Sequence, residues 1–113
     1  MKNFDIHEFD CKCGCNENKM DNKFLEKIDN ARDIAGVPFI INSGYRCPKH
    51  NSKIGSTSDN HTKGVAADIK CTNGPTRIKI LYGLIKAGFK RIGIHKKFIH
   101  ADTNDKVDSA WVY

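Results

Sequence analysis

The feature that most constrains the fold of this chain is the alternation in "RIGIHKKFIHADT", residues 91–103. Apolar and polar residues alternate on both sides of the Lys-Lys pair, which is the period of a strand whose two faces meet different surroundings. With that pair as a two-residue turn, Gly93 lies opposite His100, and Arg91 lies opposite Asp102. The pattern predicts an antiparallel hairpin with one apolar face and one polar face.

Two other segments have the character of strands. "VAADIKC", residues 65–71, alternates in the same way and carries Asp68 on its more polar face. "PFIIN", residues 38–42, is short and rich in β-branched residues. On the hairpin, the polar face is expected to hold Arg91, Gly93, His95, His100 and Asp102.

Two helices are predicted from apolar residues that recur at helical spacing. The first begins at a capping residue within 21–22 and stops at Gly36. The second is capped by Asn73 or Thr76 and ends at Gly88. The expected core stripe of the second helix comprises Ile78, Leu81, Leu84 and Ile85.

Residues 1–20 are irregular and polar, with Phe4, Ile6 and Phe9 as the expected inward anchors. With 113 residues the chain has the length of one domain, so we expect a single domain over 1–113 on which this segment packs. The chain has no run of the roughly 20 apolar residues that cross a bilayer, and its first residues do not resemble a signal peptide. We therefore expect a monomer made in the cytoplasm, with no stable membrane insertion.

The net charge of +6 favours polyanionic partners, including cell-wall polymers and nucleic acid. The lysines are spread along the whole chain, without the dense basic run or aromatic-flanked basic motif of RNA-binding proteins. We expect a well-solvated, lysine-rich surface and no nucleic-acid partner.

The chain has five cysteines, three of them in "CKCGC", residues 11–15, and the others at Cys47 and Cys71. An odd number argues against a complete intrachain disulfide framework. The C-x-C-x-C spacing is tighter than the spacing of paired ligands in zinc ribbons. We expect reduced thiols in a turn, and a structural metal and a disulfide are the alternatives.

Three polar residues form a potential metal-ligand set. Asp68 and His100 each lie on a strand between apolar neighbours, where a single polar side chain is usually a hydrogen-bonded structural residue. Together with His61 they supply two imidazoles and one carboxylate, and three protein ligands with a fourth position open to water make a catalytic zinc site. Gly93, opposite His100, is expected to leave room above the sheet for the ion and a substrate.

Three motifs resemble the zinc-dependent D-alanyl-D-alanine carboxypeptidases of peptidase family M15, in the short single-domain branch found in phage endolysins and cell-wall enzymes. The motifs are "SGYRCPKHN", "HTKGVAAD" and "FIHAD", in that order and spacing. The family's H-x-x-G-x-A-x-D motif is matched from His61 to Asp68, and its H-x-D motif at His100 and Asp102. The N-terminal "HEFDCKCGC" is similar to the opening of this branch, so the resemblance covers almost the whole chain.

The resemblance implies an α+β fold in which a small antiparallel sheet, packed with two main helices, carries one catalytic zinc ion. The ligands that it implies are His61, Asp68 and His100. It also implies that Arg46 binds the substrate carboxylate or the developing oxyanion, a role that suits a permanently charged guanidinium able to donate two hydrogen bonds. One departure is Asp59, two residues before His61, where family members often have serine.

The residue that carries the proton is left open between two candidates. Some family members place an acidic residue three positions before the last zinc ligand, where this chain has Lys97. Others use a histidine two or five positions before it, and the second of these positions is His95. Asp102 is the other candidate, and its alternative role is a salt bridge to Arg91 or a hydrogen bond to a zinc-binding histidine.

The sequence therefore predicts a zinc peptidase that hydrolyses peptide bonds in peptidoglycan stem peptides or cross-links, as a carboxypeptidase or an endopeptidase. A positive surface suits anionic cell walls. A phage lysin released by a separate membrane-permeabilising protein and a cytoplasmic recycling enzyme both fit. The alternative is a non-catalytic module of the same fold that holds zinc and binds wall peptides.

Overall fold

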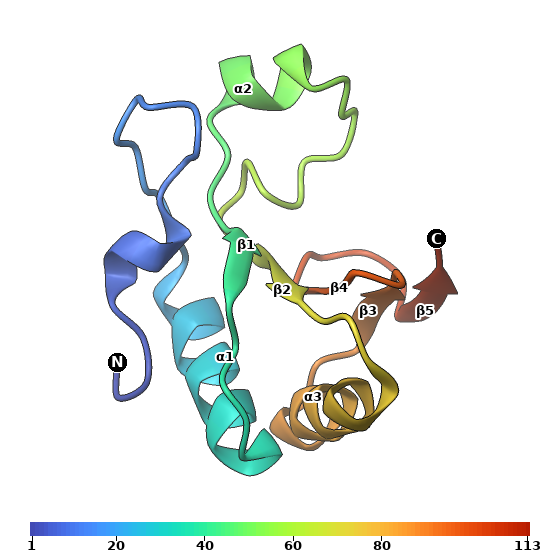
Figure 1. Ribbon diagram of the computed structural model, residues 1–113. Coiled ribbons are helices and arrows are strands. Elements are labelled where there is room, and N and C mark those ends of the chain that lie inside the picture. Colours follow the sequence, from blue (N-terminus) through green and yellow to red (C-terminus); the bar gives the residue numbers. More distant parts are fainter.

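The computed structural model describes residues 1–113, which form a five-stranded sheet, two long helices and several short elements (Figure 1). The strands are β1 (Ile41–Ser43), β2 (Ala66–Lys70), β3 (Arg91–Ile94), β4 (Phe98–Asp102) and β5 (Ser109–Val112). The helices are the 3-10 helix η1 (Ile6–Phe9), α1 (Asn22–Ala35), α2 (Pro48–Lys53) and α3 (Gly74–Ala87). None of the helices combines the length and the apolar content that crossing a membrane requires.

The strands lie in the order β1-β2-β4-β3-β5, and all neighbouring pairs are antiparallel except the parallel pair of β3 and β5. The predicted hairpin is confirmed in its register, because Gly93 pairs with His100 and Arg91 with Asp102. The α+β class is also confirmed. The sheet differs from the expected antiparallel one by the parallel strand β5, which no sequence pattern indicated.

One row of paired residues crosses the whole sheet at the level of Asp68 and His100. From β1 to β5 the paired residues are Ser43, Asp68, His100, Gly93 and Trp111. Directly paired residues point to the same face of a sheet, so one face collects these side chains. The alternate positions, such as Ile69 and Ile99, are fully buried in the core.

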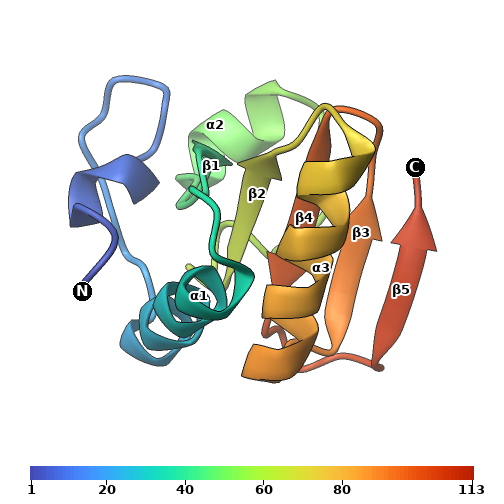
Figure 2. The ribbon, with the colours of Figure 1, turned by 60° about the horizontal axis from the view of Figure 1, so that its bottom comes forward.

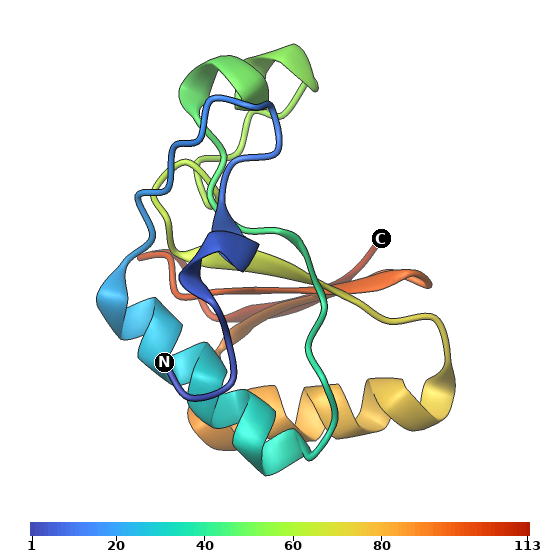
Figure 3. The ribbon, with the colours of Figure 1, turned by 60° about the vertical axis from the view of Figure 1, so that its left-hand side comes forward.

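Helices α1 and α3 cover the core face of the sheet side by side, and α2 and the N-terminal loop lie beyond its other face (Figures 1 and 3). In Figure 2, α3 runs along β4 and β3. Both helices begin at predicted caps, since Asp21 accepts the N–H of Phe24 and Asn73 accepts the N–H of Thr76. The core between helices and sheet includes Phe24, Ile28, Ile69, Ile80, Leu84, Ile92 and Ile99.

The predicted core stripe of α3 is wrong in part. Ile78 is 65% exposed and Ile85 is 61% exposed, so neither belongs to the core. Leu81 is partly buried and Leu84 is fully buried, as predicted. Ile80 and Gly83 are buried in place of the exposed pair. The cause is the contact with α1, because Gly83 lies against the backbone of Ala31 and the side chain of Ala35 and so turns this face of α3 inward.

The N-terminal segment is anchored by two aromatic residues. Phe4 and Phe9 are buried and pack edge to face with their ring centroids 5.3 Å apart. Ile6, predicted as a third anchor, is 47% exposed because this aromatic pair already fills the inward positions. Asp5 caps η1 by accepting the N–H of His7.

The segment after β1 folds as the short helix α2. Pro48 occupies the first helical position and Cys47 caps the helix. The loop that carries "CKCGC" lies beside α2 at the end of the molecule far from α1 and α3 (Figures 1 and 3). All five cysteines are free thiols, and Cys11 and Cys47 form a small buried cluster with Tyr45.

Candidate metal centre

His61, Asp68 and His100 come together on the sheet face opposite the two long helices. Asp68 and His100 are direct partners on β2 and β4, and His61 lies in the turn that leads into β2. Each residue offers one ligand atom, and the three atoms all lie within 4.8 Å of one another. The side chains of the three residues, in chain order, are 6%, 17% and 4% exposed, so the carboxylate is the most accessible.

The turn that carries His61 is fixed at its far end by Gly64. This glycine has a φ of 71°, and a Cβ there would overlap the backbone of Lys19 and Met20. The backbone N–H of Asp21 donates to the Gly64 carbonyl at 2.9 Å. A glycine is therefore required at this position by both its left-handed conformation and the close approach of another chain segment.

A backbone carbonyl orients the His61 ring. Nδ1 lies 2.8 Å from the carbonyl oxygen of Gly44, which only accepts hydrogen bonds, so Nδ1 carries the proton. Nε2 then presents a lone pair 3.5 Å from Oδ2 of Asp68. The backbone N–H of Arg46 donates to the carbonyl of His61 at 3.2 Å, so residues 44–46 hold both the ring and its main chain.

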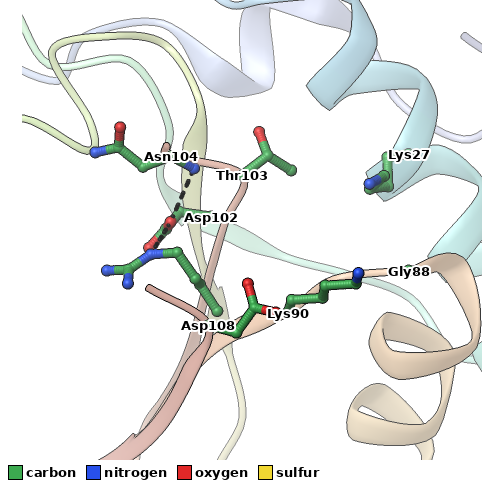
Figure 4. Close-up of a pocket in the computed structure, with 8 residues that line it drawn as sticks. Lys27, Gly88, Lys90, Asp102, Thr103, Asn104 and Asp108 are labelled. Carbon is green, nitrogen blue, oxygen red and sulfur yellow. Dashed lines mark hydrogen bonds and ion pairs between the residues drawn. The ribbon is translucent and has the colours of Figure 1, made fainter. Parts of the chain in front are cut away.

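A carboxylate orients the His100 ring. Nε2 lies 2.7 Å from Oδ2 of Asp102, and Nδ1 lies 2.9 Å from Oδ1 of Asp68. The other oxygen of Asp102 accepts the Nε–H of Arg91 at 2.7 Å and the backbone N–H of Asn104 at 3.0 Å (Figure 4). Burial raises the pKa of Asp102, but the bonds to His100 and Arg91 outweigh it and lower that pKa, so the carboxylate accepts the Nε2 proton.

This donor set fits a zinc ion. The unprotonated nitrogens of two neutral imidazoles face one carboxylate, and three such acceptors need a cation between them. Without a metal, a proton on His100 supplies the positive charge between these groups. Burial lowers the pKa of His100, but its bonds to Asp102 and Asp68 raise that pKa overall. Burial likewise raises the pKa of Asp68, but its bonds to His100 and His61 bring it well below its usual range. Two histidines and one carboxylate are the protein ligands of many catalytic zinc sites.

Arg46 lies beside this set, at the β1 edge of the sheet. Its guanidinium donates to Oδ1 of Asn51 at 2.9 Å and to Oγ of Ser43 at 3.2 Å. Ser43 is the sheet partner of Asp68, so these bonds hold the cation next to the ligand row. The side chain is half-buried, and its remaining N–H groups can bind an anionic group.

His95 lies at the turn end of the hairpin. It lies two residues beyond Gly93, the sheet partner of His100, and therefore on the same face as His100. Two residues along a strand correspond to about 7 Å between Cα atoms. Its ring stacks on Phe98 with centroids 4.5 Å apart, and its Nδ1 accepts the backbone N–H of Lys97 at 3.0 Å. Nε2 therefore carries the proton in the neutral ring, whose side chain is partly exposed.

Asp59 supports the turn before His61 through salt bridges. Its carboxylate lies 2.9 Å from Lys106 Nζ and 3.0 Å from Lys63 Nζ, and it accepts the side-chain amide of Asn104 at 2.9 Å. The bonds to these partners depress the pKa of Asp59 well below its usual range. The departure from the family's serine therefore ties this turn to the segment that follows β4.

Trp111 on β5 also lies on this face of the sheet. Its ring lies 5.4 Å from the ring of His100 and covers Gly93, where a Cβ would collide with the indole. The expected free room above Gly93 is therefore wrong, because the indole occupies it. Tyr113 lies 5.8 Å from His95 and extends the aromatic surface toward the hairpin turn. The alternation in "SAWV" is too short to have revealed this arrangement.

The family model described as "Peptidase M15" matches residues 2–102. No curated protein matches the chain significantly. The matched region includes the three converging side chains, Arg46 and both candidate proton carriers. Because this match covers far more than half of the sequence, the chain belongs to the peptidase M15 family.

Proposed function

We propose that this protein is a zinc-dependent peptidase that hydrolyses peptide bonds in peptidoglycan stem peptides or cross-links. The observation that carries the proposal is the opposed orientation of the two histidines. Each binds an outside acceptor through one ring nitrogen, the Gly44 carbonyl for His61 and Asp102 for His100, and directs the other at Asp68. Membership of the peptidase M15 family supports a peptide substrate.

The residues of the site divide the work of hydrolysis. His61, Asp68 and His100 would hold the zinc ion, which would polarise the scissile carbonyl and lower the pKa of a bound water to about 7. Asp102 and the Gly44 carbonyl fix the ring tautomers, so that neutral nitrogens face the metal position. These contacts position the ligands before substrate arrives.

Arg46 is proposed to bind the negative charge of the substrate. Two of its N–H groups are engaged by Ser43 and Asn51, which fixes the direction of the guanidinium. The others are available for a substrate carboxylate or for the oxygen that becomes negative during attack. Stem peptides of peptidoglycan carry carboxylates, which suits this cation.

His95 is the better candidate for proton transfer. Asp102 has both oxygens engaged and a side chain with no exposure, so it has no free position for water. His95 has a partly exposed ring on the same face as His100. We assign proton transfer to His95, whose Nδ1 must exchange its bond to the Lys97 N–H for the proton of the attacking water, and positioning of His100 to Asp102.

The cell wall is the proposed place of action. The excess of 19 Lys and Arg over 13 Asp and Glu gives a net charge of +6, which attracts anionic wall polymers. The aromatic surface of Trp111 and Tyr113 adjoins the ligands and offers an apolar wall for a peptide.

The test is a digest of purified peptidoglycan with wild-type protein and the His61→Ala variant. Wild-type protein is expected to release new free amines, and mass spectrometry of the fragments then identifies the bond. His61→Ala should lose one zinc per chain and reduce amine release to background. His7→Ala, which removes an exposed histidine from η1, is the matched control and should behave as wild type. Zinc and wall binding without amine release would instead indicate a binding module.

A further inference from the structure

Four of the five cysteines meet at one point outside the site described above. Three come from the "CKCGC" loop and the fourth caps α2: Cys11, Cys13, Cys15 and Cys47. Their Sγ atoms all lie within 4.8 Å of one another. Cys71 lies apart in the core, with its Sγ 3.6 Å from the carbonyl of Asn73.

The sulfur separations are those of ligands around one ion. The Sγ atoms of Cys11 and Cys13 are 3.4 Å apart, and those of Cys13 and Cys47 are 3.7 Å apart. A disulfide bond is about 2.05 Å long. In a tetrahedral site with Zn–S bonds of about 2.3 Å, sulfur atoms are about 3.8 Å apart. The observed separations match the second geometry.

The backbone around the sulfurs is arranged for thiolates. The N–H of Cys47 donates to Sγ of Cys11 at 3.3 Å, and the N–H of His50 donates to Sγ of Cys47 at 3.4 Å. Gly14 and Asn16 have φ values of 90° and 60°, which turn the loop back so that alternate residues reach one point. Such bonds to sulfur stabilise the deprotonated, metal-binding form.

The surroundings suit a site with net negative charge. The hollow that reaches Cys13, Cys15 and Cys47 is also lined by Lys49, His50 and Lys53. Four thiolates around a divalent zinc ion leave a net charge of −2, which Lys49 and Lys53 offset. The exposure of Cys13 and Cys15 provides a path for the ion to enter.

We propose that Cys11, Cys13, Cys15 and Cys47 form a second zinc site, structural in character and separate from the His61, Asp68 and His100 centre. Four soft sulfur ligands select zinc over calcium or magnesium. Because the protein supplies all four ligands, no coordination position is left for water or substrate. The proposal does not depend on the peptidase activity proposed above.

The role of such a site follows from what it joins. The buried cluster between the N-terminal loop and the segment before α2 contains only three residues, Cys11, Tyr45 and Cys47. A zinc ion there would attach residues 11–15 to the segment that carries Arg46 and the Gly44 carbonyl. Structural zinc contributes directly to folding free energy, so the site would hold these two catalytic supports in place.

Metal content separates the two sites. Protein purified with reductant and zinc is expected to hold two zinc ions per chain, and His61→Ala one. Cys15→Ser should also hold one, whereas Cys71→Ala, which removes the thiol outside the cluster, should hold two. His61→Ala loaded with cobalt should show the strong thiolate-to-cobalt charge transfer of four sulfur ligands, at one cobalt per chain.

A readout on unmodified protein guards against loss of folding in the cysteine variants. In the zinc-loaded wild type, four thiols should resist a thiol reagent and become reactive when a strong chelator removes the metal. A His61→Ala protein that binds no zinc, a His61→Ala cobalt spectrum without thiolate charge transfer, or cysteines cross-linked by disulfides despite reductant would each overturn the proposal. Loss of peptidase activity alone would leave the expected cobalt spectrum unchanged, so the two proposals fail separately.

Discussion

His100 uses its two ring nitrogens in opposite directions, and the difference between them decides what its neighbour Asp102 does. Nε2 meets Asp102 at 2.7 Å and Nδ1 meets Asp68 at 2.9 Å. An ionised, fully buried Asp102 accepts from Nε2 and leaves Nδ1 unprotonated toward the metal position. The carboxylate therefore selects the tautomer that can bind zinc.

Asp102→Asn is expected to weaken zinc binding at the His61, Asp68 and His100 centre by about 10- to 100-fold. The amide oxygen must accept the bonds from Arg91 and Asn104, so the amide nitrogen would donate a hydrogen bond to Nε2 and the ring proton would move to Nδ1, which blocks the metal-facing nitrogen. Competition with a chelator measures the affinity, and excess zinc should restore kcat.

By contrast, His95→Gln should keep its zinc and lose about 10²-fold or more in kcat. An Asp102→Asn variant with normal zinc affinity and a low kcat would make Asp102 the proton carrier instead.

The three converging side chains of the candidate site could be predicted from the sequence, but not all of the groups that orient them could be. The alternation along Phe98–Asp102 placed His100 and Asp102 on one face, and the observed register with Gly93 and Arg91 follows that pattern. The Gly44 carbonyl that holds His61 comes from a backbone atom 17 residues away. Every residue has such an atom, so no residue type marks its use.

At the scale of elements, α3 shows how packing chooses between two apolar stripes. Apolar residues lie on several sides of this helix, so helical spacing alone allowed a stripe through Ile78 and Ile85. The close approach to α1 at Gly83 selects the stripe through Ile80 and Leu84. Strand β5 was missed for a related reason, because a short, mostly exposed segment has no pattern until it pairs with β3.

Gly83→Ala is expected to destabilise the protein although alanine is the better helix former. The new Cβ would lie 2.7 Å from the Cβ of Ala35 and would overlap the Ala31 carbonyl, so α1 and α3 must move apart. Overpacking of this kind costs about 1–3 kcal/mol, against a helix-propensity gain of about 0.5–1 kcal/mol. Urea unfolding of the zinc-loaded protein measures the difference.

The matched control is Gly74→Ala, at the start of the same helix. A Cβ at Gly74 meets no atom within 4 Å, so the free energy of unfolding should change by less than about 0.5 kcal/mol. Equal effects of both substitutions, or a stabilised Gly83→Ala protein, would show that the helices are not closely packed at Gly83.

For the whole molecule, the fold leaves one sheet face to the helices and the other to the site. The net charge of +6 acts on the scale of this surface rather than on any one contact. Charges on a protein surface are screened over about 10 Å at 0.1 M salt and about 3 Å at 1 M. Attraction to an anionic wall is therefore sensitive to salt, whereas bond cleavage inside the site is not.

Raising the salt concentration from about 0.05 to about 0.5 M is expected to slow digestion of intact walls severalfold, through a higher KM. Hydrolysis of a short, soluble stem peptide should change much less, because it lacks the extended negative charge of the wall. Parallel assays of amine release from the two substrates make the comparison. An equal loss for both substrates would assign the salt effect to the site itself.

His61 and His100 differ in how readily a mutation can remove the group that orients each ring. The partner of His100 is a side chain, so a single codon change at Asp102 removes it. The partner of His61 is the main-chain oxygen of Gly44, which every residue type would retain, and this glycine is itself fixed because a Cβ there would lie 2.7 Å from the Cα of Phe9. In relatives that have lost catalysis, Asp102 should therefore be substituted before Gly44, and the hydrogen bond from the residue 44 carbonyl to His61 should still be present.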